Sequence, residues 1–430
     1  MKKIMKSLFM LFAAIFVLGA CGNGNGDTSS EDTESSDAVE ETSESTSEET
    51  ETSSDDEEVA LQFLMPGYDE GYLTEEMDAA IEQYEEENPN VTVEIVSAGW
   101  DDLNSRIVQL YQAGEAPDMM MMGSRSIRQF AEEGVLEDLG SYMTDEYLET
   151  RIDNVMESAQ VSGTQYGIPL ALSSRALFYR SDLIDQAPAN WEELLETAET
   201  VSAENDMYGF AIPTDLGNGA HELMSFIYQN EGYVVDENGE FTINSDANVE
   251  TLEYLALFNE QDGVIPNVVE TDRDEQVQMF NNEDLAMYIS GSWDKEELDT
   301  GGLDYGVVEL PEGDTKAVNL VTDSYGISSI SENKEAAWDF IEFMGTEDIQ
   351  RSISEAYNWM PVTQAELDDE RFQDDFMQPF LNIMEYGVAE PAVPNWDQFN
   401  ESFLIAVQKG VSGQASAQEA LDTAQEEVTQ

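Results

Sequence analysis

The chain has one cysteine and one histidine among its 430 residues. Cys21 has no second cysteine to pair with, so the fold has to rest on its hydrophobic core rather than on disulfide bonds. His221 alone gives little material for a histidine metal cluster or for a histidine-dependent hydrolase triad. We therefore expect no metal site and no cofactor.

Basic residues are scarce as well. The sequence holds 16 Lys and Arg against 93 Asp and Glu, which gives a formal net charge of −77. A chain this acidic is repelled by nucleic acid and by anionic lipid surfaces, and both are excluded as partners. Because salt screens repulsion between surface charges, this composition is typical of a protein that works at high salt.

Long apolar runs are absent except at the N-terminus. Residues 7–18 are almost wholly apolar and follow Lys2, Lys3 and Lys6, a pattern typical of a secretory signal peptide and too short to cross a bilayer. The small residues before Cys21 resemble the lipobox of bacterial lipoproteins. That resemblance implies that residues 1–20 are removed and that Cys21 is lipidated. An ordinary signal peptide with a chance cysteine is the alternative.

An acidic, low-complexity segment follows. Residues 22–58 hold fifteen acidic and no basic residues, with hardly any apolar ones. Such a segment cannot bury enough apolar surface to offset the entropy cost of ordering it. We expect residues 21–58 to be a lipid anchor followed by a disordered tether.

The remaining 370 or so residues exceed the usual size of one hydrophobic core and suggest two domains. Apolar or alternating segments at 60–65, 91–96 and 119–122 predict strands. Helical periodicity from Thr74, stopped at Asn88-Pro89, and over residues 103–111 predicts helices between them. This order predicts an α/β domain with a mostly parallel sheet.

The second part of the chain continues with mixed elements. Asn190 and Glu193 have the spacing of a helix capping pair. We predict strands at 208–212 and 285–289, and a hairpin at 234–243 that turns at Asn238-Gly239. Helices are expected at 337–344 and 403–407.

A series of short, different motifs follows along residues 87–362, and their order as a set points to a family. They are Glu87-Asn88-Pro89, Ala116-Pro117-Asp118, Tyr166-Gly167-Ile168-Pro169, Ala176-Leu177-Phe178-Tyr179, Asn190-Trp191-Glu192-Glu193-Leu194, Gly291-Ser292-Trp293, Asn333-Lys334-Glu335-Ala336-Ala337 and Trp359-Met360-Pro361-Val362. With this series, the chain resembles the family 1 extracellular solute-binding proteins, the maltose-binding-protein-like group.

The resemblance implies an α/β fold of two lobes, the periplasmic-binding-protein-like fold, with three inter-lobe crossings and a ligand cleft. The crossings are expected near residues 170–174, 321–324 and 360–363. One lobe would comprise 59–171 plus 325–360, and the other 175–321 plus 364–430. A ligand in the cleft favours the closed state because only there do both lobes contact it.

The resemblance also implies a function. The chain would be a lipid-anchored lipoprotein on the extracytoplasmic face of the cell membrane. It would capture a sugar or oligosaccharide and deliver it to ABC permease subunits served by a separate ATPase. A binder of another solute such as glycerol phosphate, an exported glycoside hydrolase and an acidic adhesin are the alternatives. The sequence has no G-x-S-x-G, H-E-x-x-H or Walker A motif, so we expect no enzyme.

Aromatic side chains are the first candidates for sugar contacts, because a sugar ring stacks its C–H face on a flat aromatic surface. Trp293 follows a predicted strand through two small residues, and the family places a ligand-stacking tryptophan there. Trp396 follows Pro394-Asn395 in a predicted loop. Trp359 either lines the cleft or packs at a crossing. A core position is the alternative for Trp293 and Trp396.

Polar candidates lie at strand ends and at the first crossing. Gly123, Ser124 and Arg125 follow the strand at 119–122, at the end where α/β proteins bind ligands. Arg125 can donate paired hydrogen bonds to a ligand, or it forms an ion pair with one of the many acids. The family often has an acidic residue in this loop, and this chain does not.

Four further candidates complete the predicted ligand-binding set. Ser174 and Arg175 occupy the first crossing, where sugar-binding relatives often carry an acid. Tyr68 and Asp69 follow the first predicted strand. We expect Trp100 to pack rather than bind, and Trp191 and Trp338 to belong to the core.

Overall fold

The structure is a computed structural model that describes residues 58–100, 102–211, 213–214, 216, 220–236, 239–260, 264–267, 271–391 and 393–429. The predicted signal peptide, Cys21 and nearly all of the predicted acidic tether lie outside the described residues. Among the described residues, no helix is long and apolar enough to cross a membrane.

The first three strands form the parallel unit that the sequence predicts. β1 (Val59–Pro66) lies between β2 (Val91–Ala98) and β3 (Met119–Gly123) and pairs in parallel with both. α1 (Thr74–Glu87) and α2 (Leu103–Ala113) are the connecting helices. Alternate residues of β1 enter cores on opposite faces of the sheet, so this strand is apolar on both faces.

The whole sheet is mixed rather than mostly parallel. β10 (Val318–Ile327) pairs antiparallel with β3 on one edge and with β6 (Ile168–Ser173) on the other. β10 returns from the distant second half of the chain, so no short βαβ connection fixes its direction. β11 (Gly387–Ala389) pairs in parallel with the first residues of β10 and completes the sheet order β11-β10-β3-β1-β2.

Helices cover both faces of this sheet. α1 packs on one face with α11 (Lys334–Met344) and α12 (Glu347–Ala356), over a core that contains Trp338. α2 and α3 (Ile127–Glu132) cover the opposite face. Short elements follow α3, namely α4 (Asp145–Glu149), α5 (Asp153–Glu157), β4 (Gln160–Val161) and β5 (Thr164–Gln165).

A second, antiparallel sheet consists of β7 (Ala176–Arg180) between β8 (Met287–Ser290) and β9 (Tyr305–Val308). Residues 208–212 were expected to form a strand, and that prediction is wrong: the described part of the segment makes isolated bridges from Tyr208 to Leu285 and from Ala211 to Tyr288. Gly209 instead sits against the backbone of Ala198, where a Cβ would be 2.1 Å from the carbonyl oxygen. The backbone N–H groups of Gly209 and Phe210 both donate to the Val264 carbonyl, which interrupts regular pairing with the β8 segment.

Most remaining helices pack around this second sheet. α6 (Trp191–Glu204), α7 (Ala220–Gln229), α8 (Asp246–Leu257), α14 (Trp396–Val411) and α15 (Ala417–Val428) share one core. α9 (Arg273–Asn281), α10 (Lys295–Gly301) and α13 (Gln378–Ile383) lie on the other side of the sheet. The predicted hairpin at 234–243 is reduced to one bridge, Val235 to Phe241, and Asn238 lies outside the described residues.

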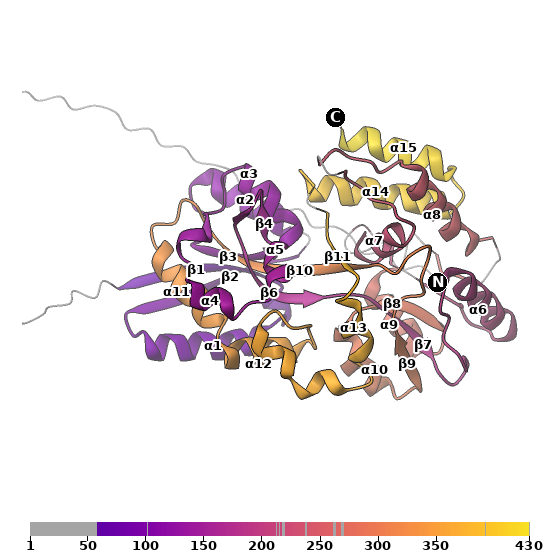
Figure 1. The fold of residues 1–430 in the computed structure, drawn as a ribbon, viewed down its shortest axis with the longest axis horizontal. Helices are drawn as coiled ribbons and strands as arrows, with labels where there is room; N and C mark the ends of the chain where they lie inside the picture. Colours follow the sequence, from indigo (N-terminus) through magenta and orange to yellow (C-terminus); the bar gives the residue numbers. More distant parts are fainter. Residues whose placement is uncertain are drawn as a thin grey trace, which may run out of the picture. The chain divides into compact units, whose positions relative to one another are not determined.

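Three chain segments meet between the two groups of elements. β10 passes from the group around α7 to the group around β1, with β6 beside it (Figure 1). Met360 forms a bridge to Leu172 of β6, which brings a third segment alongside. These are the segments at which the sequence places the inter-lobe crossings.

Candidate functional site

A pocket with a volume of ≈ 370 Å³ lies between the two groups of elements. Its walls come from segments far apart in the sequence: the start of α2, the end of β3 and the start of α14. The side chains and backbone that line it are Trp100, Leu103, Asn104, Gly123, Arg125, Leu216, Trp396, Asp397, Asn400 and Glu401. Asn104 Nδ2 donates a hydrogen bond of 2.8 Å to Asp397 Oδ1 and joins the two walls.

Arg125 enters the pocket because a glycine precedes it at the end of β3. A Cβ at Gly123 would stand 2.2 Å from Arg125 Nη1, so only glycine leaves room for the guanidinium to fold back over the strand end. Nη1 lies 3.6 Å from Glu390 Oε2, and the guanidinium carbon lies 5.4 Å from the Trp396 ring centroid. Arg125 thus contacts both an acid and an aromatic ring.

Ser124 plays a different part from Arg125. Its buried hydroxyl lies 2.8 Å from the Ser324 hydroxyl and forms a hydrogen bond between the loop after β3 and strand β10. The side chain is therefore engaged within the fold, where it fixes the start of the loop that carries Arg125.

Trp396 begins a helix instead of lying in the expected loop. Asn395 caps α14 by accepting a hydrogen bond from the Gln398 backbone N–H, and Trp396 is the first residue of that helix. Its ring stacks on the His221 ring, with centroids 5.7 Å apart, and only 4 % of the residue is exposed. The helix start thereby fixes the ring in the wall of the pocket, where it contacts Arg125.

His221 and Glu390 form a buried pair beside Trp396. His221 Nδ1 lies 2.6 Å from Glu390 Oε1. Burial lowers the pKa of His221 and outweighs the opposing effect of Glu390. Burial alone would raise the pKa of Glu390, but His221 and Arg125 outweigh it, so that pKa lies below its usual value. Glu390 is therefore an anion at neutral pH.

Trp293 lies in the short helix Ser292–Asp294 that follows β8. Its half-buried ring has the guanidinium carbon of Arg175 4.8 Å and that of Arg273 5.2 Å from its centroid. Such distances are typical of cation–π contacts. The predicted stacking platform is thus in contact with two arginines.

Glu222 joins these two arginines. Its Oε1 accepts hydrogen bonds from Arg175 Nε at 2.5 Å and from Arg273 Nη2 at 2.7 Å, and the residue is 0 % exposed. Burial opposes ionisation of Glu222, but Arg273 and Arg175 outweigh burial and lower its pKa. Arg175, one of the predicted ligand contacts, is therefore held in a buried ion pair.

Glu222 and Arg273 were not among the residues predicted from the sequence. One signal was available: Glu222 directly precedes the mostly apolar run Leu223–Tyr228. The structure buries every residue of α7, Glu222 included. A carboxylate in a fully buried helix needs a cationic partner. The pairing with Arg273, 51 residues away, was not visible without the fold.

Trp359 belongs to an aromatic cluster. Its ring stacks on Tyr357 with centroids 5.5 Å apart, and Tyr72 lies 5.1 Å from Tyr357 and 5.5 Å from Trp100. Trp359 itself is buried, whereas the other three rings are partly exposed. Trp100, which we expected to pack only, both packs in this cluster and lines the pocket.

Asp323 lies on β10 opposite Gly123 of β3 and Ala171 of β6. The side chain is half-buried, and within the described part of the chain its carboxylate makes no hydrogen bond or ion pair shorter than 4.0 Å. Burial raises its pKa to about 6, with Arg125 and Arg175 acting in the opposite direction and Glu390 in the same direction. Asp323 is a second polar residue that the sequence analysis did not select.

The remaining candidates are used within the fold or lie elsewhere. The Tyr68 hydroxyl donates to the Asp78 carboxylate of α1, and Asp69 is exposed. Ser174 is buried, and its hydroxyl has no hydrogen-bond partner among the described residues. Of the predicted ligand contacts, only Gly123, Arg125 and Trp396 line the described pocket. The others are not among its lining residues: Tyr68, Asp69, Ser124, Ser174, Arg175, Trp293 and Trp359.

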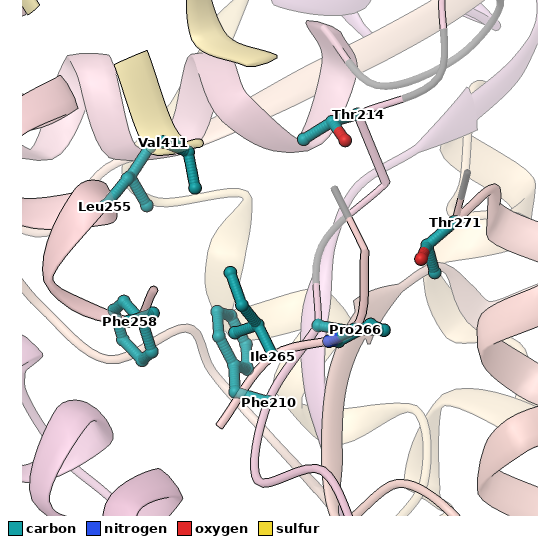
Figure 2. A pocket seen from close by; sticks show the side chains of 9 residues that line it. Phe210, Thr214, Leu255, Phe258, Ile265, Pro266, Thr271 and Val411 are labelled. Atoms are coloured by element: carbon teal, nitrogen blue, oxygen red, sulfur yellow. The ribbon is translucent and has the colours of Figure 1, made fainter. Parts of the chain in front are cut away.

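A second cavity is too small for a solute. It has a volume of ≈ 20 Å³ and is lined mostly by apolar side chains, including Phe210, Leu255, Phe258 and Ile265. Figure 2 shows these side chains around it, with the hydroxyls of Thr214 and Thr271 near its edge. Such a volume holds about one water molecule. Among the described residues, no group of three or more His, Cys, Asp or Glu could hold a metal ion.

Known proteins share this architecture. A Listeria monocytogenes ABC substrate-binding protein in complex with cycloalternan superposes with a TM-score of 0.76 at 23 % identity, over 87 % of this chain and 98 % of that one. A putative binding protein of Brucella abortus is 25 % identical over 76 % of this chain and 82 % of its own length. A maltotriose-binding protein of Pyrococcus abyssi is 25 % identical over 70 % of this chain and 67 % of its own length.

The two-lobe fold of these binding proteins is therefore the fold of this chain. The family profile described as bacterial extracellular solute-binding protein matches residues 70–351, which is well over half of the sequence. The match spans β3, β6, β8 and β10, the strands that position Arg125, Arg175, Trp293 and Asp323. The chain belongs to the bacterial extracellular solute-binding proteins.

Proposed function

We propose that this protein captures a sugar or oligosaccharide outside the cell and delivers it to the permease of an ABC importer. One observation carries the proposal: the ≈ 370 Å³ pocket combines aromatic rings with hydrogen-bonding side chains. Trp100 and Trp396 offer apolar surface, and Arg125, Asn104 and Asn400 offer donors or acceptors. A sugar has the matching surfaces, C–H faces ringed by hydroxyls.

Relatives support the sugar class. The solved Listeria protein holds cycloalternan, and the Pyrococcus relative is a maltotriose-binding protein. A galactooligosaccharide-binding protein of Bacillus subtilis is a further relative. These ligands differ in linkage and size but share the polyhydroxyl chemistry that the pocket suits.

We further propose the lobe boundaries predicted from the sequence, 59–171 plus 325–360 and 175–321 plus 364–430. With these boundaries, the Asn104–Asp397 hydrogen bond and the Arg125–Glu390 ion pair both connect one lobe to the other. A ligand between the lobes adds contacts to each of them and favours closure. Small-angle scattering should show a smaller radius of gyration with saturating sugar, and an unchanged radius despite binding would contradict closure.

Membrane attachment belongs to the proposal too. Lipidation of Cys21 would hold the protein at the extracytoplasmic face, and the acidic tether would let the lobes reach the permease. The hydrolysis of ATP falls to a separate subunit, because this sequence has no Walker A motif. Binding without chemical conversion is the activity expected of such a component.

A ligand screen tests the sugar proposal. The mature protein would be melted in high salt with maltotriose, galactooligosaccharides, monosaccharides and glycerol 3-phosphate, and hits would be measured by calorimetry. We expect a higher melting temperature with at least one sugar and no turnover of it. If only glycerol 3-phosphate raised the melting temperature, the ligand would be a non-sugar solute. If an oligosaccharide were hydrolysed, the protein would be a glycosidase.

A further inference from the structure

The position of Asp323 places a carboxylate at the junction of the predicted lobes. Strand β10 carries it beside Gly123, which lines the pocket, and beside Ala171 of β6. Arg125, Arg175 and Glu390 are close enough to influence its ionisation, and Asp323 in turn influences Tyr72 of the aromatic cluster. The carboxylate is thus near enough to both the aromatic cluster and the charged residues of the site to interact electrostatically with them.

The nearby charges are already paired with one another. Arg175 donates to Glu222, and Arg125 lies against Glu390. Three arginines, Arg125, Arg175 and Arg273, lie near three carboxylates, Glu222, Glu390 and Asp323. Asp397 and Glu401 line the pocket as well. Of the three carboxylates, Asp323 is the one without a hydrogen bond or close ion pair in the described residues.

An unpaired, half-buried carboxylate weakens the fold. Its folded pKa of about 6 exceeds the ordinary value of 3.8, so folding favours the protonated form. At neutral pH the ionised group therefore costs stability that an uncharged isostere would not cost. Groups that destabilise the fold in this way are enriched at functional sites, where a ligand supplies the missing partner.

We propose that Asp323 is the acceptor that selects the ligand, taking a hydrogen bond from a hydroxyl of a neutral sugar and disfavouring anionic solutes. The inference rests on the sugar-binding function proposed above and narrows its ligand class. A hydroxyl supplies the proton donor that the carboxylate lacks. A uronate or a phosphate ester would bring a second negative charge into the same partly desolvated space, and like charges at short range are strongly unfavourable there.

The substitution Asp323→Asn tests this role, because asparagine keeps the shape and removes the charge. Glu253→Gln is the matched control. Glu253 is exposed on α8, so this substitution makes the same change in net charge outside the site. Each variant and the wild type would be titrated with maltotriose, galactooligosaccharides, trigalacturonate and glycerol 3-phosphate. Melting would be measured in parallel.

The expected results separate a ligand contact from a structural residue. Asp323→Asn should raise the dissociation constant of the neutral sugar about tenfold or more, because a charge-assisted hydrogen bond is lost. It should also raise the melting temperature at pH 7 by about 2 °C or more, because the unpaired charge is gone. A residue that merely holds the fold together would lower the melting temperature instead. Glu253→Gln should alter neither.

The pH profile gives a second readout. In the wild type, sugar affinity should fall as the pH drops below about 6, because protonation removes the anionic acceptor. Burial and Glu390 favour this protonation, and Arg125 and Arg175 oppose it. His221 also titrates in the site but is present in both proteins, so the difference between the wild type and Asp323→Asn isolates Asp323.

Three results would overturn the proposal. Unchanged sugar affinity in Asp323→Asn would remove Asp323 from the site while leaving sugar binding intact. Tighter binding of trigalacturonate or glycerol 3-phosphate than of neutral sugars would show that the site prefers anionic ligands. If the wild type bound none of the sugars, the proposed function itself would fail, and the role of Asp323 with it.

Discussion

The indole ring of Trp293 lies against the backbone of Gly291. A Cβ at position 291 would stand 2.0 Å from Trp293 Cζ3, far inside any ordinary contact distance. The absence of a side chain at Gly291 therefore lets the ring fold over its own loop and face Arg175 and Arg273. The orientation of the Trp293 ring therefore depends on glycine at position 291.

Gly291→Ala should consequently displace the Trp293 ring. We expect the sugar affinity to fall by about 1.4 kcal/mol, a tenfold rise in the dissociation constant, because the ring and its two arginines move together. Calorimetry measures the affinity, and tryptophan fluorescence reports the changed environment of the ring. Equal affinity and an unaltered emission spectrum would show that the loop absorbs the methyl group.

Trp293→Ala removes the ring itself. As the predicted stacking platform, Trp293 should carry a large share of the sugar affinity, so we expect a loss of about 2 kcal/mol, close to thirtyfold. The matched control is Trp338→Ala, because Trp338 is a buried core ring between Tyr142 and Tyr147. That control should lose about 3–5 kcal/mol of stability. A similar loss of stability in Trp293→Ala, with affinity kept in the folded fraction, would make Trp293 a core residue.

Glu222→Gln should destabilise the protein strongly. The change leaves the buried guanidinium of Arg175 and that of Arg273 without their shared anion, at a cost of about 3–5 kcal/mol. Asp299→Asn is the comparison, because the Lys295–Asp299 pair is partly exposed and contributes at most about 0.5 kcal/mol. Urea unfolding measures both. Similar small losses in the two variants would show that water or other acids replace Glu222.

The Glu222 ion pair should also make the stability of the protein depend on pH. The folded pKa of Glu222 is depressed below its ordinary 4.5, so its contribution is present above about pH 4.5 and is lost as the pH falls through the lower folded value. The stability difference between the wild type and Glu222→Gln should therefore shrink below pH 4.5. A difference that stays constant down to pH 3 would contradict the assigned ion pair.

Salt should stabilise the protein. From residue 59 onward there are 78 acidic and 13 basic residues, 78 − 13 = 65 net negative charges that repel one another. The Debye length shrinks from about 10 Å at 0.1 M to about 3 Å at 1 M. Melting temperature should rise steeply with NaCl over this range. A flat profile would show that the charges are already compensated locally.

Cys21→Ala should release the protein from the membrane. Acyl chains on Cys21 would contribute about 0.8 kcal/mol per buried CH₂ group, and without them no apolar anchor precedes the acidic tether after signal removal. Cell fractionation measures the distribution of the variant. Membrane retention equal to that of the wild type would reject lipidation at this residue.

The elements that depend on local patterns were predictable from the sequence. Alternation at residues 91–96 and the helical spacing after Thr74 correspond to β2 and α1, and Asn190 caps α6 by accepting from the Glu193 backbone N–H. Residues 208–211 form isolated bridges rather than a strand ladder, because the N–H groups of Gly209 and Phe210 bond to the Val264 carbonyl, far away in the sequence. Periodicity reports burial, and it does not report the hydrogen-bond partner.

The site was only partly readable. Arg125 and Trp293 could be selected because each follows a strand end through a glycine, a local signal. Asp323 could not, because 93 acids make any single acid uninformative, and for Glu222 the apolar run beside it was the one available signal. Their surroundings distinguish these two acids. Glu222 forms ion pairs with two arginines, and Asp323 has no hydrogen bond or ion pair in the described residues.

The sequence by itself determined the acidity of the protein, the parallel βαβ start of the fold and the family resemblance, because each depends on composition or on residues near one another in the chain. Only the tertiary structure decided which side chains share the pocket. Trp100, Arg125 and Trp396 come together through the packing of α2, β3 and α14. Ion pairing and burial act over a few ångströms in space, whatever the separation in sequence. The charge state of Asp323 and the pairing of Glu222 therefore exist only once β10 and α7 are in place.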